Sequence, residues 1–137
     1  MKNKSGFTLL EIIIVIIIVG VLASLALPRF FATVEFSRST EALASITAVR
    51  QSMERCYLQR SGTYGTCSSF ANLDLEDPAN SPNSHFTYAI SGMNASAYTV
   101  TATRNTRDGG TTAGTITLQQ NLAGVTRGGT TAFSGIN

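Results

Sequence analysis

The feature that most constrains this chain is an apolar stretch of 21 residues near its N-terminus, from Phe7 to Leu27. Its only clearly polar residues are Thr8, Glu11 and Ser24. As an α-helix at about 1.5 Å per residue, the stretch reaches about 30 Å, the thickness of the hydrocarbon core of a bilayer. A chain of 137 residues has room for one domain and can hardly surround such a helix. The sequence therefore predicts a helix retained in a membrane at some stage.

Two other interpretations of this stretch stay open. A cleaved secretory signal requires small residues after its apolar region, and Ala23, Ser24 and Ala26 supply them loosely. A fully buried helix or strand of a soluble domain is the second alternative. The apolar pattern passes into a helical pattern beyond Pro28 without a break in composition, and this favours a retained segment.

The charge of the chain is concentrated at its N-terminal tip. The sequence has 10 Lys and Arg residues against 8 Asp and Glu residues, and both lysines, Lys2 and Lys4, precede the apolar stretch. The rest of the chain is neutral by side-chain charge. The positive-inside rule therefore places the N-terminus in the cytoplasm and the remainder outside. A net charge of +2 gives no electrostatic reason to expect binding to nucleic acid.

Glu11 is the one charged residue inside the apolar stretch. A charge at this depth costs a few kcal/mol even on the mildest insertion scales, so it usually has a partner. One interpretation is that Glu11 lies close enough to the interface to reach water. The other is that its carboxylate awaits a cation brought by a neighbouring subunit, because a pair formed only in the correct stagger sets the register of an assembly.

The N-terminal residues resemble the signature of a known family. Gly6-Phe7-Thr8-Leu9-Leu10-Glu11, followed by the apolar run and by Ala26-Leu27-Pro28, is similar to the start of type IV pilins and of the related pseudopilins of type II secretion. The resemblance covers about the first 30 residues. It implies that a prepilin peptidase cuts after Gly6 and leaves Phe7 as a new N-terminus, which is usually N-methylated.

The resemblance also implies roles within the helix. Glu11 is expected to pair with the Phe7 amine of an adjacent subunit during filament assembly. Gly20 and Pro28 fall where filaments of this family often loosen the helix, and Pro28 lacks the backbone N–H that a regular turn needs. The expected partners are other copies of the chain, the prepilin peptidase, the inner-membrane pilus or secretion machinery and, before assembly, membrane lipid.

We therefore expect three parts: a cleaved leader (1–6), a transmembrane and filament-core half-helix (7–28) and a globular pilin domain (29–137). Before assembly the chain is expected in the inner membrane as a single-pass protein with a cytoplasmic N-terminus. After assembly it is expected in an extracellular pilus filament.

Beyond Pro28 the pattern predicts an amphipathic helix from about Arg29 to Gln59, with Gly62 as its stop signal. Apolar residues recur there at three- and four-residue steps: Ala42, Ile46, Val49, Met53 and Cys56/Tyr57. Joined to the apolar half, this gives a helix of about 50 residues and about 80 Å, which a globule of this size cannot bury.

After a loop rich in turn-forming residues, apolar residues alternate with period two, as in β-strands. The three runs are Phe86, Tyr88 and Ile90, then Tyr98, Val100 and Ala102, then Ile116 and Leu118. Asp108-Gly109-Gly110 is expected to turn the second run into the third, and a fourth short strand is expected near Thr131–Phe133. The predicted fold class is α+β: the amphipathic half of a long N-terminal helix packs on an antiparallel sheet of three to four strands, as in pilins.

The two cysteines, Cys56 and Cys67, have ten residues between them, a spacing that fits no common zinc site. The predicted topology places them in an oxidising compartment, where a disulfide between them is favoured over two free thiols. Closing a loop of about a dozen residues contributes about 3 kcal/mol in the chain-entropy model. Many type IV pilins instead close a region near the C-terminus.

Signals for catalysis or metal binding are weak. His85 has no obvious nucleophile or orienting acid and is interpreted as a surface or strand-edge residue. Asp74, Glu76 and Asp77 offer oxygens to calcium, which some pseudopilins bind, but they lack a recognisable loop pattern, so a solvated turn is favoured. We expect no catalytic residue, no metal and no cofactor, and hence no enzyme.

Three arginines are candidate contacts for DNA. They are Arg104, Arg107 and Arg127, but the chain from residue 61 onward also contains four acidic residues. No specific nucleic acid is therefore expected as a partner.

These features favour a structural subunit of a type IV pilus that serves adhesion, motility or DNA uptake through the assembled fibre. The alternatives are a pseudopilin of a type II secretion system and a membrane-anchored binding module.

Overall fold

The computed structural model describes residues 6–136. They form two compact units with the boundary between Val34 and Glu35, and one helix, α1 (Leu9–Gln59), continues through this boundary. Lys2, Lys4 and the rest of the predicted leader before Gly6 lie outside the described residues. The predicted division between residues 28 and 29 concerns where the membrane half ends, and it stays a prediction.

In the first unit, the described chain is almost entirely the N-terminal part of α1. The large apolar side chains from Phe7 to Leu27 are exposed, from 40% at Ile13 to 80% at Phe7. Among residues 6–136, α1 is the only helix long and apolar enough to cross a membrane. An apolar surface of this extent requires lipid or another protein to cover it.

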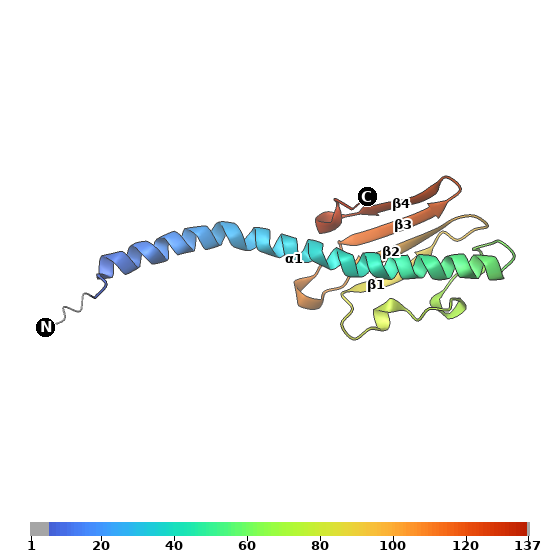
Figure 1. Cartoon of the computed structure of the whole chain (residues 1–137), viewed down its shortest axis with the longest axis horizontal. Coiled ribbons are helices and arrows are strands. Elements are labelled where there is room, and N and C mark those ends of the chain that lie inside the picture. Colours follow the sequence, from blue (N-terminus) through green and yellow to red (C-terminus); the bar gives the residue numbers. More distant parts are fainter. Residues whose placement is uncertain (1–5, 137) are drawn as a thin grey trace. The chain divides into compact units, whose positions relative to one another are not determined.

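In the second unit, the part of α1 from Glu35 onward lies along one face of a sheet (Figure 1). Its buried residues recur every three or four positions, as predicted for an amphipathic helix: Ser39, Ala42, Ile46, Val49, Ser52, Met53 and Cys56. The helix ends before Ser61 and Gly62, which have left-handed φ angles of 59° and 78°. The Gly62 N–H donates to the Tyr57 carbonyl oxygen at 3.0 Å, so the predicted stop at Gly62 is confirmed.

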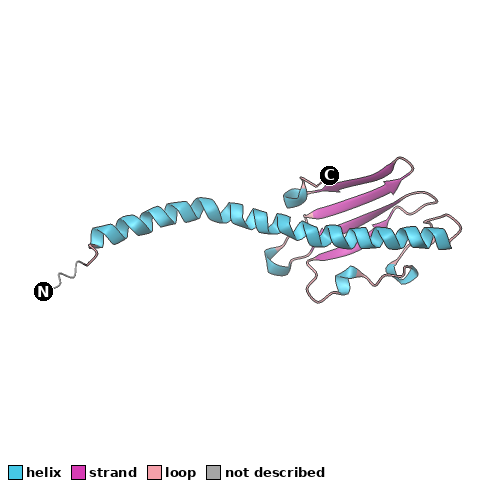
Figure 2. Cartoon of the chain, in the orientation of Figure 1, coloured by secondary structure: helices cyan, strands magenta, loops and turns pink. Residues whose placement is uncertain are grey.

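The sheet is an antiparallel meander of four strands in the order β1-β2-β3-β4 (Figure 2). The strands are β1 (Phe86–Ser91), β2 (Tyr98–Arg104), β3 (Thr115–Asn121) and β4 (Gly124–Gly129). Tyr88 pairs with Ala102, and Ala102 pairs with Ile116, so the inward residues of the first three strands align on one face. The three strands predicted from period-two alternation are confirmed.

The core lies between α1 and the inner face of the sheet. Tyr98, Val100 and Ala102 of β2 are at most 1% exposed, and they pack in one cluster with Ile46 and Val49 of α1. Burial of apolar surface stabilises such a cluster by about 25 cal/mol per Å². The globular unit therefore has its own core, and α1 supplies one wall of it.

The position predicted for the fourth strand is wrong. Thr131–Phe133 forms a 3-10 helix, η4, and the fourth strand is β4, which precedes it. The core-side positions of β4 are Val125, Arg127 and Gly129, so this edge strand has no apolar alternation to detect. Gly129 is required for another reason: a Cβ atom there would lie 2.1 Å from the carbonyl oxygen of Phe133.

Candidate functional site

The first turn of α1 is capped by Thr8. Its hydroxyl accepts a hydrogen bond from the Glu11 backbone N–H at 3.2 Å, and its carbonyl accepts one from the Ile12 N–H at 3.3 Å. The Thr-x-x-Glu spacing is a sequence signature of a helix N-cap. Thr8 and Glu11 therefore fix where α1 begins, two residues after the Phe7 predicted to become the N-terminus.

The predicted assembly residues, Phe7 and Glu11, lie beside this cap. Both are exposed, and Phe7 is 80% exposed. Among residues 6–136, the Glu11 carboxylate forms no ion pair. Its pairing with the Phe7 amine of another subunit, the cleavage after Gly6 and the methylation of Phe7 stay predictions.

Gly20 and Pro28 both lie inside the continuous helix α1. A Cβ atom at Gly20 would meet nothing within 4 Å, so glycine is not required there by packing within the subunit. Pro28 removes one backbone donor from the helix ladder. Loosening of the helix at these two positions in a filament stays a prediction.

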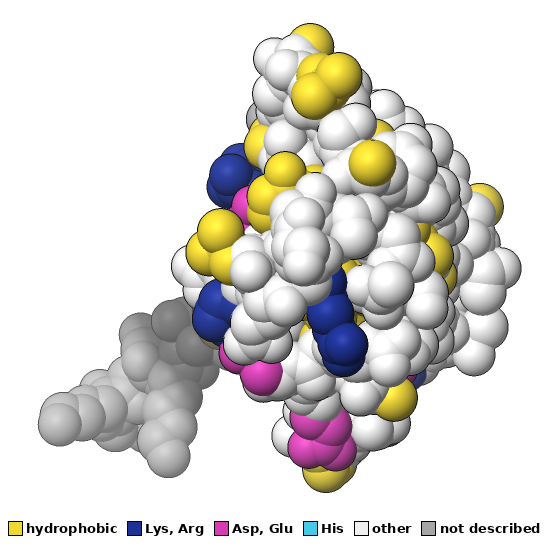
Figure 3. Space-filling view, turned by 90° about the vertical axis from the view of Figure 1, so that its right-hand side faces the viewer, with side chains coloured by type: hydrophobic (Ala, Val, Ile, Leu, Met, Phe, Trp, Pro, Cys, Tyr) yellow, Lys and Arg dark blue, Asp and Glu magenta, His cyan; other side chains and the backbone are white. Residues whose placement is uncertain are grey.

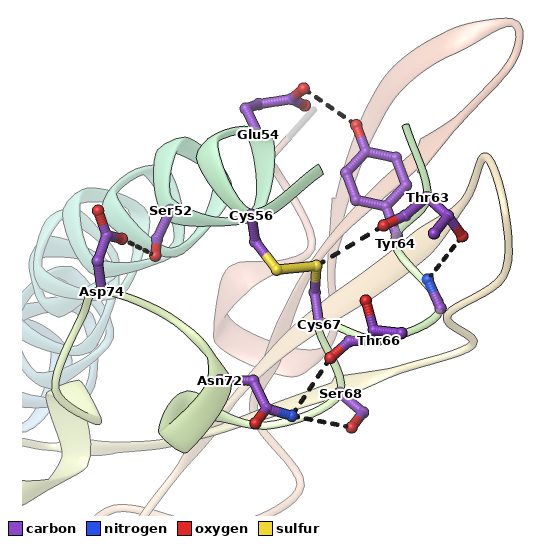
Figure 4. Close-up of a disulfide and its surroundings, with 11 residues drawn as sticks. Ser52, Glu54, Cys56, Thr63, Tyr64, Thr66, Cys67, Ser68, Asn72 and Asp74 are labelled. Carbon is purple, nitrogen blue, oxygen red and sulfur yellow. Dashed lines mark hydrogen bonds between the residues drawn. A yellow bond between two sulfur atoms is a disulfide. The ribbon is translucent and has the colours of Figure 1, made fainter. Parts of the chain in front are cut away.

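The cysteines form the predicted disulfide. Cys56, near the end of α1, is bonded to Cys67 in the following loop, and their Cα atoms are 6.2 Å apart (Figure 4). Both residues are buried, at 4% and 0% exposure. The bond fixes the loop that leaves α1 to the last turns of the helix.

Two polar contacts flank the disulfide on either side of α1 (Figure 4). Asp74 accepts hydrogen bonds from Arg55 and from Ser52, and these contacts lower the pKa of Asp74 to about 2, with Arg55 as the larger cause. The Tyr64 hydroxyl donates to Glu54 at 3.0 Å. Burial, followed by this contact with Glu54, raises the pKa of Tyr64 to about 12. Asp74, for which the sequence favours a solvated turn over calcium binding, thus forms an ion pair with Arg55.

The neighbouring acids, Glu76 and Asp77, stabilise the turn that follows them. Asp77 accepts the Ala79 backbone N–H at 2.9 Å and so caps the short helix η2 (Pro78–Asn80), while Glu76 accepts from the Asn80 side chain at 3.3 Å. Within the described range, 6–136, no group of three or more His, Cys, Asp or Glu side chains is arranged to hold a metal ion.

The three candidate arginines do not act as one exposed patch. Arg104 is only 1% exposed, so it is unavailable to DNA. Arg107 and Arg127 are exposed, and Arg107 donates to the Pro82 carbonyl at 2.5 Å. In Figure 3, which shows the right-hand end of Figure 1, basic side chains stand apart from one another on a mostly uncharged surface.

Arg104 instead joins the sheet to α1. Its guanidinium donates to both Glu35 oxygens, at 3.0 and 3.1 Å, and to the backbone carbonyls of His85, Asn105 and Arg107 at 2.8 to 3.2 Å. The hydrogen bond from Arg104 is the main cause of the lowered pKa of Glu35. A buried arginine is tolerated because its donors are all directed at acceptors.

The sequence shows no obvious acid to orient His85, but the structure places a carboxylate at each of its ring nitrogens. Its Nδ1 lies 2.8 Å from Oε2 of Glu41, and its Nε2 lies 3.0 Å from Oδ2 of Asp108. The acids are 44 and 23 residues away in sequence, so no local pattern shows them. The predicted turn at Asp108 is confirmed as the helix η3 (Arg107–Gly109).

Comparisons with known protein families extend the N-terminal resemblance to the globular unit. Residues 28–117 match the family described as "Type IV minor pilin ComP, DNA uptake sequence receptor". Residues 1–27 match the prokaryotic N-terminal methylation motif.

Individual relatives include both pilins and pseudopilins. The type IV narrow pilus major component PilA5 of Thermus thermophilus is 34% identical over 108 residues, which are 74% of this chain and 89% of that protein. Type II secretion system core protein G of Aeromonas hydrophila is 31% identical over 81 residues, 59% of this chain and 56% of that protein. A fimbrial protein of Pseudomonas aeruginosa is 34% identical over 59 residues, 43% of this chain and 38% of that protein.

The chain thus spans about half the length of the secretion relative and less of the fimbrial relative, but most of the Thermus pilin. A long N-terminal helix on a four-stranded antiparallel sheet, the methylation motif and the match over 28–117 agree with one another. The chain belongs to the family of type IV pilins and their related pseudopilins, and within it matches the minor pilin ComP group.

Proposed function

We propose that this chain is a subunit of a type IV pilus, processed after Gly6 and polymerised through the apolar half of α1. In this account, Phe7 becomes the N-terminus, and its amine pairs with Glu11 of an adjacent subunit. The observation that carries the proposal is the exposed apolar surface from Phe7 to Leu27, which ends at a globular unit with a complete core of its own. This exposed N-terminal part of α1 contributes no residue to the core of the globular unit, so its apolar side chains are available for lipid first and other subunits later.

The pilus is favoured over the secretion pseudopilus by the extent of the similarities. The alignment with the Thermus pilin covers 74% of this chain, against 59% for the Aeromonas secretion protein. The minor-pilin family match also extends across the globular unit to residue 117, beyond the N-terminal helix that the two classes share.

The test is to shear the surface of cells that express the natural chain, and to examine the released material by electron microscopy and mass spectrometry. We expect fibres that contain this chain with Phe7 as its first residue. Absence of the chain from all fibres, or retention of Met1, would contradict the proposal. A fibre that forms only when a type II secretion system is present would replace it with the pseudopilin alternative.

Reception of DNA is a second candidate function, favoured by the description of the matched family. The globular unit itself is balanced in charge, because residues 35–137 hold seven arginines and seven acidic residues. Arg60 and Arg127 are exposed and form no ion pair among the described residues. Any contact with phosphates therefore depends on a few separate arginines, and we expect weak binding that salt suppresses strongly.

Fluorescence anisotropy with a labelled DNA duplex tests this second candidate. We plot log K for DNA binding against the logarithm of the salt concentration. Arg60→Gln and Arg127→Gln are each expected to reduce the magnitude of the slope by about one, the value for one lost phosphate contact. Gln59→Ala, next to Arg60, is the matched control that leaves charge unchanged. Equal affinity of all four proteins would exclude these arginines as the DNA contacts.

A further inference from the structure

His85 lies immediately before β1 with its ring between carboxylates from two other elements. Nδ1 is 2.8 Å from Oε2 of Glu41 in α1, and Nε2 is 3.0 Å from Oδ2 of Asp108 in η3. The backbone N–H of His85 also donates to Oε1 of Glu41 at 2.8 Å. The side chain is 21% exposed, so these contacts are its main surroundings.

Both ring contacts are hydrogen bonds only when the ring is doubly protonated. An ionised carboxylate only accepts, and a neutral imidazole has a single N–H to donate. A neutral His85 therefore turns a lone pair toward one of the two carboxylates. Histidine is the side chain that ordinarily changes charge between about pH 5 and 8.

The contact with Asp108 is the one that a neutral ring loses. Glu41 also accepts a hydrogen bond from the backbone N–H of His85, which holds its carboxylate next to Nδ1. This favours keeping the single proton of a neutral ring on Nδ1. Asp108 then keeps Arg38, whose Nη2 is 3.5 Å away, and the nearby charge of Arg107. Its φ of 52° is left-handed, a conformation that a residue other than glycine adopts at some cost and that its contacts must maintain.

His85 completes a chain of alternating charges. From one end to the other, the chain is Arg104, Glu35, Arg38, Asp108, His85 and Glu41, with successive contacts of 3.0, 3.1, 3.5, 3.0 and 2.8 Å. Two further groups adjoin it: Arg107 interacts with Asp108, and Tyr88 of β1 interacts with Glu41. The protonated ring is thus the positive link between two negative ones.

The turn that Asp108 belongs to covers the buried end of this chain. Gly109 and Gly110, directly after Asp108, line a cavity of about 70 Å³ together with Glu35 and Arg104. The turn also packs closely on Arg104, since a Cβ atom at Gly110 would lie 2.4 Å from the Arg104 guanidinium carbon. Release of Asp108 would therefore uncover the Arg104 guanidinium, the buried partner of the Glu35–Arg104 pair.

We propose that His85 is a proton-dependent clamp: its protonated ring holds the Asp108–Gly110 turn over the Glu35–Arg104 pair, and its neutral ring releases that turn. This device is independent of whether the chain assembles. Because the sequence contains one histidine, a single substitution of His85 tests whether this side chain carries the pH dependence.

Hydrogen exchange of the full mature chain in detergent micelles, followed by NMR, tests the clamp. The probe is the Gly110 amide, which donates to the Arg107 carbonyl at 3.1 Å inside the turn. After correction for intrinsic exchange, we expect its protection to fall about tenfold or more from pH 5 to pH 8, because a charge-assisted hydrogen bond is lost. The Val100 amide, in the centre of the sheet, is the reference and should stay protected at both pH values.

Two variants give opposite predictions. His85→Gln cannot supply the second charged donor, so we expect the Gly110 amide to be poorly protected at both pH values. Asp108→Asn keeps a side chain that can accept a hydrogen bond from a protonated ring or donate one to a neutral ring. We therefore expect the Gly110 amide to be protected at both pH 5 and pH 8. Unchanged protection of Gly110 in the natural chain from pH 5 to pH 8, or a fall of equal size in Asp108→Asn, would overturn the proposal.

Discussion

Arg104 and Glu35, 69 residues apart in sequence, form a two-bonded ion pair with N–O distances of 3.0 and 3.1 Å. The pair joins the end of β2 to the first residue of α1 that belongs to the globular unit. Arg104 is almost completely buried, whereas Glu35 is 26% exposed and is also bound by Arg38. The pair therefore fixes the helix to the sheet at the point where the core begins.

Removal of Arg104 is expected to destabilise the globular unit strongly. Arg104→Met leaves Glu35 without its main partner and several backbone carbonyls without a donor, so we expect a loss of about 3–5 kcal/mol in the free energy of unfolding. Denaturant unfolding of the mature chain in detergent measures it. Arg127→Gln, an exposed arginine on β4, is the control and should change stability by about 0.5 kcal/mol or less. Similar stability of the two variants would show that the buried Arg104–Glu35 pair does not stabilise the contact between α1 and the sheet.

Acid is expected to weaken the region around the disulfide. The pKa of Asp74 is lowered to about 2 by Arg55 and Ser52, so its contribution is present above the ordinary aspartate pKa and is lost as the pH falls toward 2. Unfolding measured between pH 5 and pH 2 should therefore show a decline in stability that Asp74→Asn makes shallower. An identical decline in the variant would assign acid sensitivity to other groups, of which Glu35, with its lowered pKa, is the first to examine.

Reduction of the Cys56–Cys67 disulfide is expected to destabilise the fold without abolishing it. The bond closes a short loop, with a sequence separation of 11, so the chain-entropy model gives about 3 kcal/mol. The Cys56→Ser/Cys67→Ser double variant should unfold at correspondingly lower denaturant and should not respond to reductant. A natural chain whose midpoint is also unaffected by reductant would contradict this role.

Gly110 is expected to reject a side chain because of its neighbours. A Cβ atom there would lie 2.2 Å from the Asn105 carbonyl oxygen. Gly110→Ala should therefore cost about 1–3 kcal/mol through displaced backbone. Gly65→Ala is the matched control, because its nearest neighbour would be the Thr63 hydroxyl at 3.4 Å. Circular dichroism during thermal unfolding compares the two variants, and an equal effect would contradict the close packing of the η3 turn.

The parts of the fold with a regular period were predictable from sequence. Heptad-like spacing from Ala42 to Met53 identified the buried face of α1, and alternation identified β1, β2 and β3. The position of β4 was not predictable from alternation, because this edge strand consists mostly of glycine and polar residues and is held by backbone pairing with β3 alone.

The polar interior was less predictable, because its partners are distant in sequence. Arginine is rarely buried, so residue type gives no reason to expect Arg104 in the interior, and only the fold brings Glu35 to it. His85 meets Glu41 and Asp108 for the same reason. The cap at Thr8, in contrast, was available from the Thr-x-x-Glu spacing that the family signature contains.

The most direct test of the filament account is the assembly of Glu11→Gln subunits, which keep the shape of the side chain and lose its charge. Processing and membrane insertion should be normal, with Phe7 first by mass spectrometry. Electron microscopy of sheared cell surfaces should show fibres for the natural chain and for the control Glu76→Gln, and none for Glu11→Gln. Normal fibres built from Glu11→Gln subunits would contradict the pairing of Glu11 with the Phe7 amine.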